Sequence, residues 1–341
     1  MRFLKAVFAL ILVVAILAGV ALGYGWFWLS GEVAKPGPLG QETEFTIERG
    51  EGLASVANRL ESLGLVSDKR VLRIQARLDD IESDIKAGSY VVPGRASVAD
   101  ILDQFVEGKV IEYRLTIPEG FTTAQVLRRV EAATDLTGDM PERTFDEGVL
   151  LPDTYAFGAG TTRTQFLERM ETAQDDLLAA IWDTRQADLP ISTPQEAVIL
   201  ASVVEKETAS ADERPLVAGL FVGRLKKGMR LESDPTIIYG VSQGEPLYNR
   251  QGQRRTLYRS EIDRKTDWNT YQIDGLPKTP ICNPGRDAIA AVLDPPRTDY
   301  VFFVADGKGG HLFAETYAEH QKNVAAYRRY ERGEITRERE N

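Results

Sequence analysis

The feature that most constrains this chain is a long uncharged stretch near its N-terminus. Residues 6–31 read AVFALILVVAILAGVALGYGWFWLSG and follow the basic residues Arg2 and Lys5. A helix needs about 20 apolar residues to cross the hydrocarbon core of a membrane, so the stretch predicts a transmembrane helix over residues 6–30. Aromatic residues typical of the headgroup level gather at its far end, namely Tyr24, Trp26, Phe27 and Trp28.

The charges around this stretch predict its orientation. Basic residues before it and Glu32 after it favour a cytoplasmic N-terminus (residues 1–5) and a chain that continues outside the cytoplasm. The alternative is a signal peptide, cleaved near residues 18–23. The apolar core of a signal peptide has about 7–15 residues. This stretch continues through the aromatic residues without a break, which favours an uncleaved anchor.

The composition narrows the partners and cofactors of the remaining chain. Lys and Arg number 41 and Asp and Glu number 51, a formal charge of −10, which argues against nucleic acid as a partner. A neutral glycan is compatible with this charge. Cys282 is the single cysteine, and His311 and His320 are the two histidines, so neither a disulfide nor a zinc site is expected. We therefore predict no metal and no cofactor.

Changes in pattern along the chain predict an α+β protein with several parts. Residues 31–43, rich in Gly and Pro, are typical of a short linker. Residues 44–110 predict a small α+β module in the order strand, helix, helix, strand, helix. Residues 111–330 predict a larger mixed α+β domain, and residues 331–341 form a charged C-terminal tail.

Within the larger domain, hydrophobic periodicity predicts one strand from Ile111, several helices and two hairpin-like segments. The helices are expected near residues 122–133, 163–184, 193–208 and 212–227, and the hairpin-like segments in the 230s and around residues 300–304.

The helix that starts after Thr193 carries the strongest candidate for chemistry. Leu200, Val203, Val204 and Glu207 fall at spacings i, i+3, i+4 and i+7, so Glu207 extends the apolar stripe, whereas Glu205 lies about 200° around the helix. Burial raises the pKa of a carboxyl toward the range of a general acid. The alternative is that Glu207 ends a frayed helix and reaches solvent.

Polar and aromatic residues downstream resemble the lining of a carbohydrate site, which needs planar polar groups and an aromatic face. Each of them could equally be a turn residue or a loop anchor. The candidate substrate-binding residues are Arg224, Asp234, Thr236, Tyr239, Asn269, Tyr271 and Asn283.

The stretch ASVVEKETASADERPLVAGLFVGRLKKGMRLESDPTIIYG resembles the signature of the endolytic murein transglycosylases, the YceG-like family. The resemblance continues through EGVLLPDTYAF, DWNTYQIDGLPKTPICNPG, YVFFVADGKGGHLF and a final EH. It implies that Glu207, the second glutamate of the EKET run, is the catalytic acid/base, and that residues 44–110 form a LysM-like module. Two positions depart from the family pattern, with Gly223 where Asn is common and Glu232 where Gln is common.

The resemblance also implies a substrate and a location. The expected protein spans the inner membrane once and cuts peptidoglycan strands in the periplasm between N-acetylmuramic acid and N-acetylglucosamine. Such cleavage leaves 1,6-anhydro ends and ends the elongation of nascent strands beside membrane-bound peptidoglycan synthases. The sequence does not require a second catalytic acid. The candidates for one are Glu205, Glu213, Glu232 and Asp234. The alternatives are a hydrolytic muramidase and a membrane-tethered, non-catalytic peptidoglycan-binding protein.

Overall fold

A computed structural model of the chain describes residues 2–48, 50–208 and 210–332. It shows a mixed α+β protein of two compact units, of which the first comprises Met1–Tyr113 with Ala156–Gly160 and the second Arg114–Tyr155 with Thr161–Asn341. Most of the predicted charged tail, residues 333–341, lies outside the described residues.

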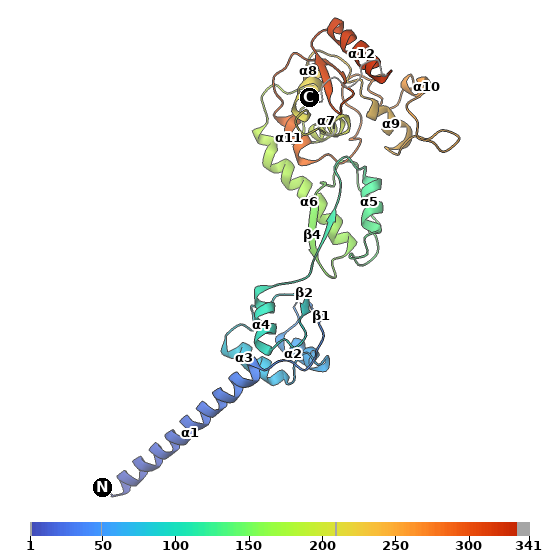
Figure 1. The fold of residues 1–341 in the computed structure, drawn as a ribbon. Helices are drawn as coiled ribbons and strands as arrows, with labels where there is room; N and C mark the ends of the chain where they lie inside the picture. Colours follow the sequence, from blue (N-terminus) through green and yellow to red (C-terminus); the bar gives the residue numbers. More distant parts are fainter. Residues whose placement is uncertain (1, 49, 209, 333–341) are drawn as a thin grey trace, which may run out of the picture. The chain divides into compact units, whose positions relative to one another are not determined.

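The first unit contains the predicted small module (Figure 1). Its elements are α1 (Arg2–Ala34), β1 (Thr43–Ile47), α2 (Leu53–Ser62), α3 (Lys69–Leu78), β2 (Gly88–Val92) and α4 (Val98–Glu107). The predicted order of strands and helices after α1 is confirmed. β1 pairs with β2 in antiparallel register, with Phe45 opposite Tyr90. Both rings pack against Phe105, at centroid distances of 5.9 and 4.6 Å, so three aromatic rings form the centre of a small core.

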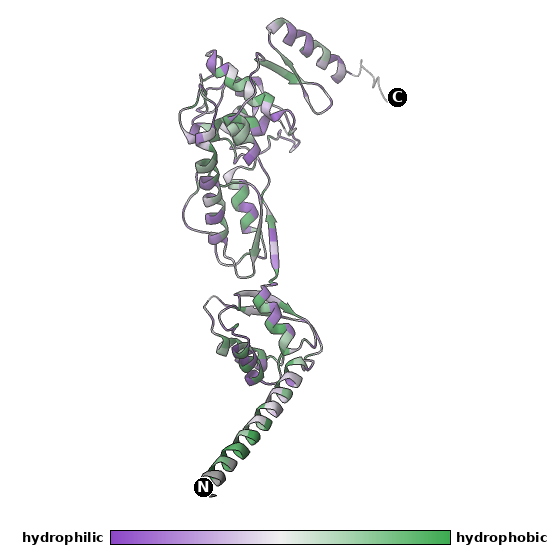
Figure 2. Ribbon diagram, turned by 90° about the vertical axis from the view of Figure 1, so that its left-hand side faces the viewer, coloured by the Kyte–Doolittle hydropathy of each residue, from purple (hydrophilic) through white to green (hydrophobic). Residues whose placement is uncertain are grey.

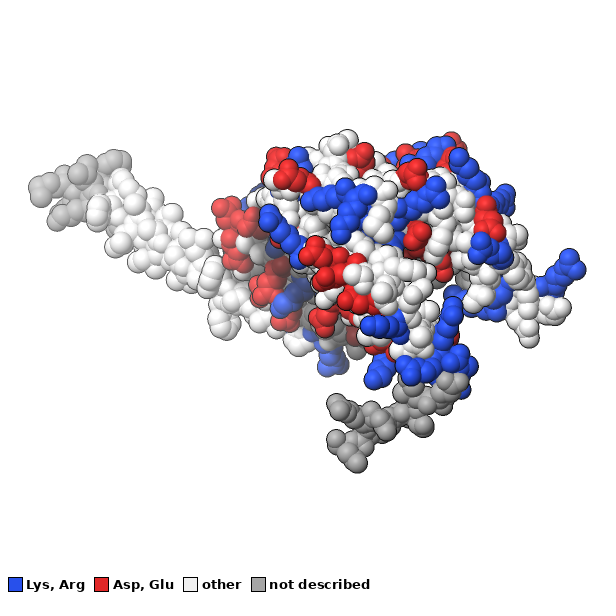
Figure 3. Space-filling view, turned by 90° about the horizontal axis from the view of Figure 1, so that it is seen from above, with Lys and Arg blue, Asp and Glu red and all other residues white. Residues whose placement is uncertain are grey.

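The predicted apolar helix is present as α1. Its segment Leu10–Ala34 is long and apolar enough to cross a membrane. Figure 2 shows most of α1 in the colour of hydrophobic residues, and in Figure 3 most of it carries no charged side chain. An exposed helix with apolar residues on every side is poorly suited to water.

The segment expected as a linker differs from the prediction. Helix α1 continues to Ala34, and Leu29 and Val33 near its end are buried in the core of the first unit. The backbone N–H of Gly37 then donates to the carbonyl oxygens of Arg95 and Ala96, both at 3.2 Å. A module of this size has little apolar surface of its own to bury, so the end of α1 completes its core.

Leu29→Ala is expected to destabilise the first unit by about 2 kcal/mol, because truncation of a buried leucine loses its apolar contacts and leaves a cavity. Leu22 is the matched control, since its side chain is 75% exposed on the same helix whereas Leu29 is 7% exposed. Urea unfolding of both variants in detergent micelles measures the difference. Equal midpoints for the two variants would show that the helix end does not belong to the core.

The second unit contains the predicted larger domain. Strands β3 and β4 pair with each other and lie only partly in this unit. These two strands and the elements of the unit follow in chain order. They are β3 (Glu112–Thr116), α5 (Thr123–Glu131), β4 (Thr154–Gly158), α6 (Arg163–Ile181), η1 (Trp182–Thr184), α7 (Pro194–Glu207), α8 (Arg214–Lys226), α9 (Asp234–Ser242), α10 (Arg259–Ile262), α11 (Arg286–Leu293), β5 (Phe302–Ala305), β6 (His311–Ala314) and α12 (Tyr317–Glu331).

Helix α7 lies at the centre of the second unit. Every residue from 197 to 204 is buried, and α8 and α11 pack against this helix (Figure 1). Its start follows the predicted signal, because the Thr193 hydroxyl accepts the Glu196 N–H at 3.1 Å and Pro194 occupies the first turn. The helix emerges at its C-terminal end, where Lys206 is exposed and Glu205 and Glu207 are partly buried.

The hairpin expected in the 230s is wrong, because residues 234–242 form helix α9. Ser233 precedes this helix, and Pro235 lies in its first turn, where a missing N–H costs nothing. Thr236, Ile237 and Tyr239 are buried, so tertiary packing supports the helix despite its β-branched residues. Gly240 lies within α9, where an added Cβ would come within 2.5 Å of the Thr266 hydroxyl.

Candidate functional site

Glu207 is the last residue of α7, and its side chain is only partly exposed. Burial is the main cause that raises its pKa, to about 7, and the charge of Asp234 raises it further. The Ser233 hydroxyl, His311 and Arg224 act in the opposite direction. A carboxylate at the C-terminal end of a helix also meets the negative end of the helix dipole. The group can therefore both donate and accept a proton near neutral pH.

Glu205, two residues earlier, is engaged differently. Its carboxylate accepts the backbone N–H of Gly285 at 3.0 Å and lies 3.8 Å from the buried guanidinium of Arg214. By contrast, no described residue makes a hydrogen bond of standard geometry with the Glu207 carboxyl, although the Ser233 hydroxyl lies close enough to lower its pKa. Of the two glutamates, Glu205 is held in place and Glu207 is available.

Three polar side chains surround this carboxyl. The Tyr271 hydroxyl donates to Asp234 Oδ1 at 2.9 Å, and Asp234 is exposed at the start of α9. Burial raises the pKa of Tyr271, as does the charge of Asp234, so the phenol stays protonated as a donor. The Ser233 hydroxyl is buried and has no hydrogen-bond partner of standard geometry among the described residues. This hydroxyl therefore acts on the Glu207 carboxyl from within the protein and lowers its pKa.

Thr270, which the sequence did not single out, fixes this arrangement. Its hydroxyl accepts the Ser233 N–H at 3.0 Å and lies 2.9 Å from the hydroxyl of Thr236. Asn269 is also fully buried, and its amide donates to backbone carbonyls of residues 261–264. Thr236 and Thr270 thus join the start of α9 to the segment that carries Tyr271, and Asn269 joins that segment to α10. Their side chains are occupied within the protein.

Arg224 lies beneath the same site and is buried. Its Nε donates to Val301 O at 2.6 Å, and Nη1 donates to Leu231 O at 2.8 Å and Glu232 Oε2 at 3.2 Å. Glu232, the residue that departs from the family pattern, is therefore paired with Arg224, and Asp234 is the carboxylate that raises the pKa of Glu207. Arg224 holds the backbone before α9 in position.

A histidine and a carboxylate form a second pair near Glu207. Glu213 accepts the backbone N–H of His311 at 2.8 Å through Oε1, and Glu213 Oε2 lies 2.8 Å from His311 Nδ1. His311 begins β6, and its ring packs edge-on against Phe303. The charge of His311 lowers the pKa of Glu207. The pair joins the β5–β6 hairpin to the segment between α7 and α8.

Tyr239 and Asn283 belong to another cluster, centred on Glu147. The Glu147 carboxylate accepts hydrogen bonds from Thr123 N at 2.7 Å, Tyr239 Oη at 3.0 Å and Asn283 Nδ2 at 3.3 Å. Burial raises the pKa of Glu147, and these donors act against that rise. Sequence reasoning missed Glu147, although it opens the EGVLLPDTYAF stretch. Its hydrogen bonds are all internal, which indicates a structural anchor.

The structure thus separates the predicted site residues into three groups. Glu207, Asp234, Tyr271 and Arg224 come together; Thr236 and Asn269 support them; Tyr239 and Asn283 surround Glu147. Within residues 2–48, 50–208 and 210–332, no group of three or more His, Cys, Asp or Glu side chains is placed to hold a metal ion. The first group offers an acid, one phenol hydroxyl, a carboxylate acceptor and a buried guanidinium.

Asp234→Asn is expected to lower the pKa of Glu207, by less than about one pH unit, because the Asp234 charge disfavours ionisation of its neighbour. NMR titration of the Glu207 carboxyl carbon measures the change. Asp212→Asn is the control, since this exposed aspartate lies in the segment between α7 and α8 and is not among the main groups acting on Glu207. An unchanged or raised pKa in Asp234→Asn would contradict the arrangement described here.

Comparison with known proteins places the chain in a family. An endolytic murein transglycosylase of Streptococcus pneumoniae serotype 2 is 29% identical over 327 residues, covering 82% of this chain but 57% of that protein, so the chain spans little more than half of its length. One of Bacillus subtilis is 24% identical and covers 82% of this chain and 83% of that protein. The crystal structure of a yceG-like protein from Listeria monocytogenes is 24% identical, with a TM-score of 0.48, and covers 83% of this chain and 99% of that one. The model of the YceG-like family matches residues 45–326, and the chain belongs to this family.

Proposed function

We propose that this protein is a membrane-anchored endolytic transglycosylase of peptidoglycan, with Glu207 as its acid/base. The observation that carries the proposal is a partly buried carboxyl with a pKa of about 7 and no hydrogen bond of standard geometry from a described residue. The names of the relatives in Streptococcus and Bacillus support the same activity.

The reaction needs one group that acts first as an acid and then as a base. Glu207 gives its proton to the oxygen that leaves when the bond between N-acetylmuramic acid C1 and N-acetylglucosamine breaks. The C6 hydroxyl of the muramyl residue then attacks C1 and returns its proton to Glu207, which leaves a 1,6-anhydro end. Both steps require a pKa near the working pH, which burial at the end of α7 provides.

The other carboxylates are unsuited to serve as a nucleophile or second base. Glu205, Glu213 and Glu232 are each paired with a basic side chain, and Asp234 accepts the Tyr271 hydroxyl. Ordinary glycosidases use two free carboxylates that flank the bond. Among the candidate carboxylates of the described residues, Glu207 is the one without such a partner, which favours attack by the substrate's own hydroxyl over hydrolysis.

The supporting residues then take distinct roles. Tyr271 and Asp234 would bind sugar hydroxyl or acetamide groups, since they are the partly exposed polar groups beside the acid. Arg224, Thr236 and Asn269 would act as positioning residues, because their polar atoms are used within the protein. Tyr239 and Asn283 would act through the Glu147 cluster.

Mass spectrometry of the fragments released from purified peptidoglycan tests the reaction. Anhydro-muramyl ends, lighter by one water than reducing ends, are the expected products. Reducing ends would instead assign a hydrolytic muramidase. Retention on peptidoglycan without release of fragments would assign a non-catalytic binding protein.

The first unit would serve location and substrate contact. We propose that α1 anchors the protein in the inner membrane with its N-terminus in the cytoplasm, which puts both units in the periplasm. Reporter fusions at either end test this topology. The β1–α2–α3–β2 order supports a LysM-like module that contacts glycan, and loss of peptidoglycan binding on its deletion is the expected result. Co-purification with a peptidoglycan synthase tests whether the protein acts on nascent strands and ends their elongation.

A further inference from the structure

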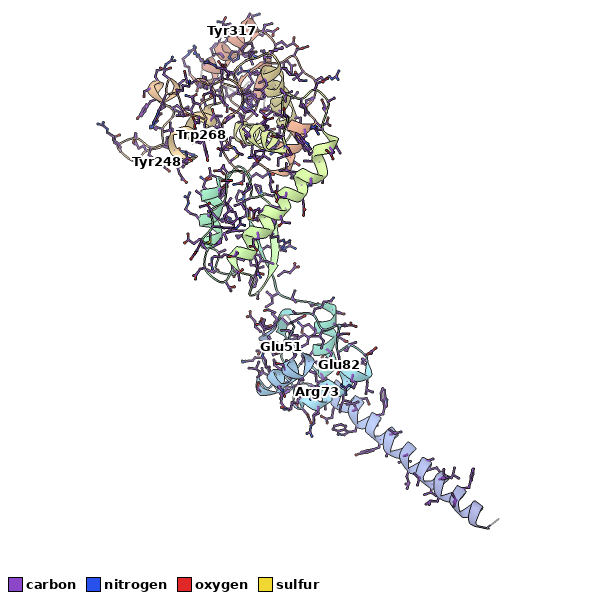
Figure 4. All side chains as sticks on the ribbon, turned by 180° about the vertical axis from the view of Figure 1, so that it is seen from behind. Glu51, Arg73, Glu82, Tyr248, Trp268 and Tyr317 are labelled. Carbon is purple, nitrogen blue, oxygen red and sulfur yellow. The ribbon has the colours of Figure 1, made fainter. Side chains whose placement is uncertain are left out.

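A pocket of about 250 Å³ lies in the second unit between α9 and the segment that connects α9 to α10. Its lining combines apolar and cationic side chains, including Lys206, Tyr239, Leu247, Arg254, Leu257 and Ile281. Figure 1 shows the connecting segment as a loop that extends from the unit, and Figure 4 labels Tyr248 on it. The pocket thus has a wall of α9 on one side and a projecting loop on the other.

Two of the cations in this pocket are available to a ligand. Among the described residues, neither Lys206 nor Arg254 has an ion-pair partner, and both are exposed; Lys206 Nζ donates to the backbone oxygen of Gly120 at 3.2 Å. Arg255, by contrast, makes a two-point contact with Glu261, at 2.7 Å from each oxygen. The carboxylate in the lining, Glu245, is paired with Arg128. Unpaired positive charge therefore remains in the pocket.

The pocket adjoins the candidate active site along the chain at two points. Lys206 directly precedes Glu207, and Pro235, which also lines the pocket, directly follows Asp234. Its floor is rigid, because Tyr239 is fixed by Glu147 at 3.0 Å and packs edge-on against Trp268. The same two chain segments, the end of α7 and the start of α9, thus carry both the pocket and the acid.

We propose that this pocket binds an acidic peptide that is attached to the sugar beside the bond cleaved at Glu207. The inference rests on the proposed function and deepens it, since it makes the peptide-bearing strand the preferred substrate. Carboxylates of the peptide would pair with Lys206 and Arg254, and its apolar side chains would contact Leu247, Leu257 and Ile281.

Size and chemistry favour a peptide over a further sugar unit. Pockets that enclose a whole small ligand have about 300–1,000 Å³, so about 250 Å³ suits one or two side chains of a larger substrate. A sugar ring in a polysaccharide site needs planar polar groups along its edge. Here the walls combine apolar side chains with the unpaired cations Lys206 and Arg254.

Charge reversal in the projecting loop tests the proposal. The expected result for Arg254→Glu in the full-length protein is a drop of about tenfold in the ratio of kcat/KM on peptide-bearing strands to kcat/KM on strands stripped of peptide by an amidase. Arg250→Glu is the matched control, because Arg250 is exposed on the same loop and does not line the pocket. It should leave the ratio at the wild-type value.

Calorimetric binding of a disaccharide tetrapeptide, compared with the same disaccharide without peptide, tests the pocket without cleavage. Arg254→Glu should weaken binding of the peptide-bearing ligand about tenfold and bring its Kd close to that of the bare disaccharide. Equal Kd values for both ligands with the wild type, or equal effects of Arg254→Glu and Arg250→Glu, would overturn the proposal. A wild type that binds the peptide selectively but cleaves neither strand would instead refute the proposed function and leave the pocket assigned.

Discussion

Glu207→Gln is expected to abolish fragment release from peptidoglycan, with a loss of roughly a thousandfold or more in kcat, because the amide can neither give nor accept the proton. The change is nearly isosteric, and no hydrogen bond of standard geometry from a described residue is lost with it. The fold should therefore persist, and the variant should still bind peptidoglycan. Release of anhydro-muramyl ends, measured by mass spectrometry, is the readout.

The same substitution should change how stability depends on pH. The pKa of Glu207 in the folded protein, about 7, lies above the usual value of 4.5, so the folded state holds the proton more tightly than the unfolded state. This stabilisation is fully present below about pH 4.5 and is lost as the pH rises through about 7, with a magnitude of roughly 3 kcal/mol. Glu207→Gln removes the dependence, so it should be more stable than the wild type at pH 8 and equal to it near pH 4.5, as measured by urea unfolding.

Glu205→Gln provides the matched control on the same helix. Glu205 is tied to Gly285 and Arg214, so its amide variant should keep cleavage within about tenfold of the wild type. The wild-type rate should also fall as the pH rises past about 7, because the acid form of Glu207 is lost. Inactive Glu205→Gln together with active Glu207→Gln would reverse the assignment.

Asn283→Ala is expected to lower the free energy of unfolding by about 3 kcal/mol, because it leaves a buried donor without a partner and opens a small void. The Asn283 amide oxygen accepts the Leu150 N–H at 2.9 Å, and its amide nitrogen donates to Phe121 O and the Thr123 hydroxyl, both at 3.1 Å. The sequence suggested a substrate-binding role for this residue, whereas the internal contacts favour a stability effect. Urea unfolding together with KM separates the two.

Asn323→Ala is the control for this experiment. Its amide makes one contact of 3.5 Å with Phe313 O, at the limit of a hydrogen bond, so the change should cost less than about 1 kcal/mol. A raised KM without loss of stability in Asn283→Ala would favour direct contact with substrate. That outcome would also place the Glu147 cluster within the substrate site.

Local signals in the sequence predicted four helices of the second unit, α5 to α8, because their caps and their buried faces agree, whereas α9 to α12 were not predicted. Thr193 with Pro194 marked α7, and hydrophobic spacing marked α8. Helix α9 was missed, since its β-branched residues are typical of a strand and its support comes from Thr270, 34 residues away from Thr236. Contacts between residues so far apart in the sequence produce no periodic pattern of hydrophobic residues.

The sequence alone predicted the apolar N-terminal helix, the order of strands and helices that follows it and Glu207 as the acid/base, because each prediction depends on local pattern or on one specific motif. The tertiary structure decided which polar residues accompany that acid. Asp234 and Tyr271 lie beside Glu207, whereas Tyr239 and Asn283 donate hydrogen bonds to Glu147. The sequence pattern had not singled out Glu147. Residue type and spacing cannot tell a side chain that is free from one whose hydrogen bonds are already made. The end of α7 carries two glutamates, and only their surroundings show that Glu205 is held by Gly285 and Arg214 while Glu207 is left available for a proton.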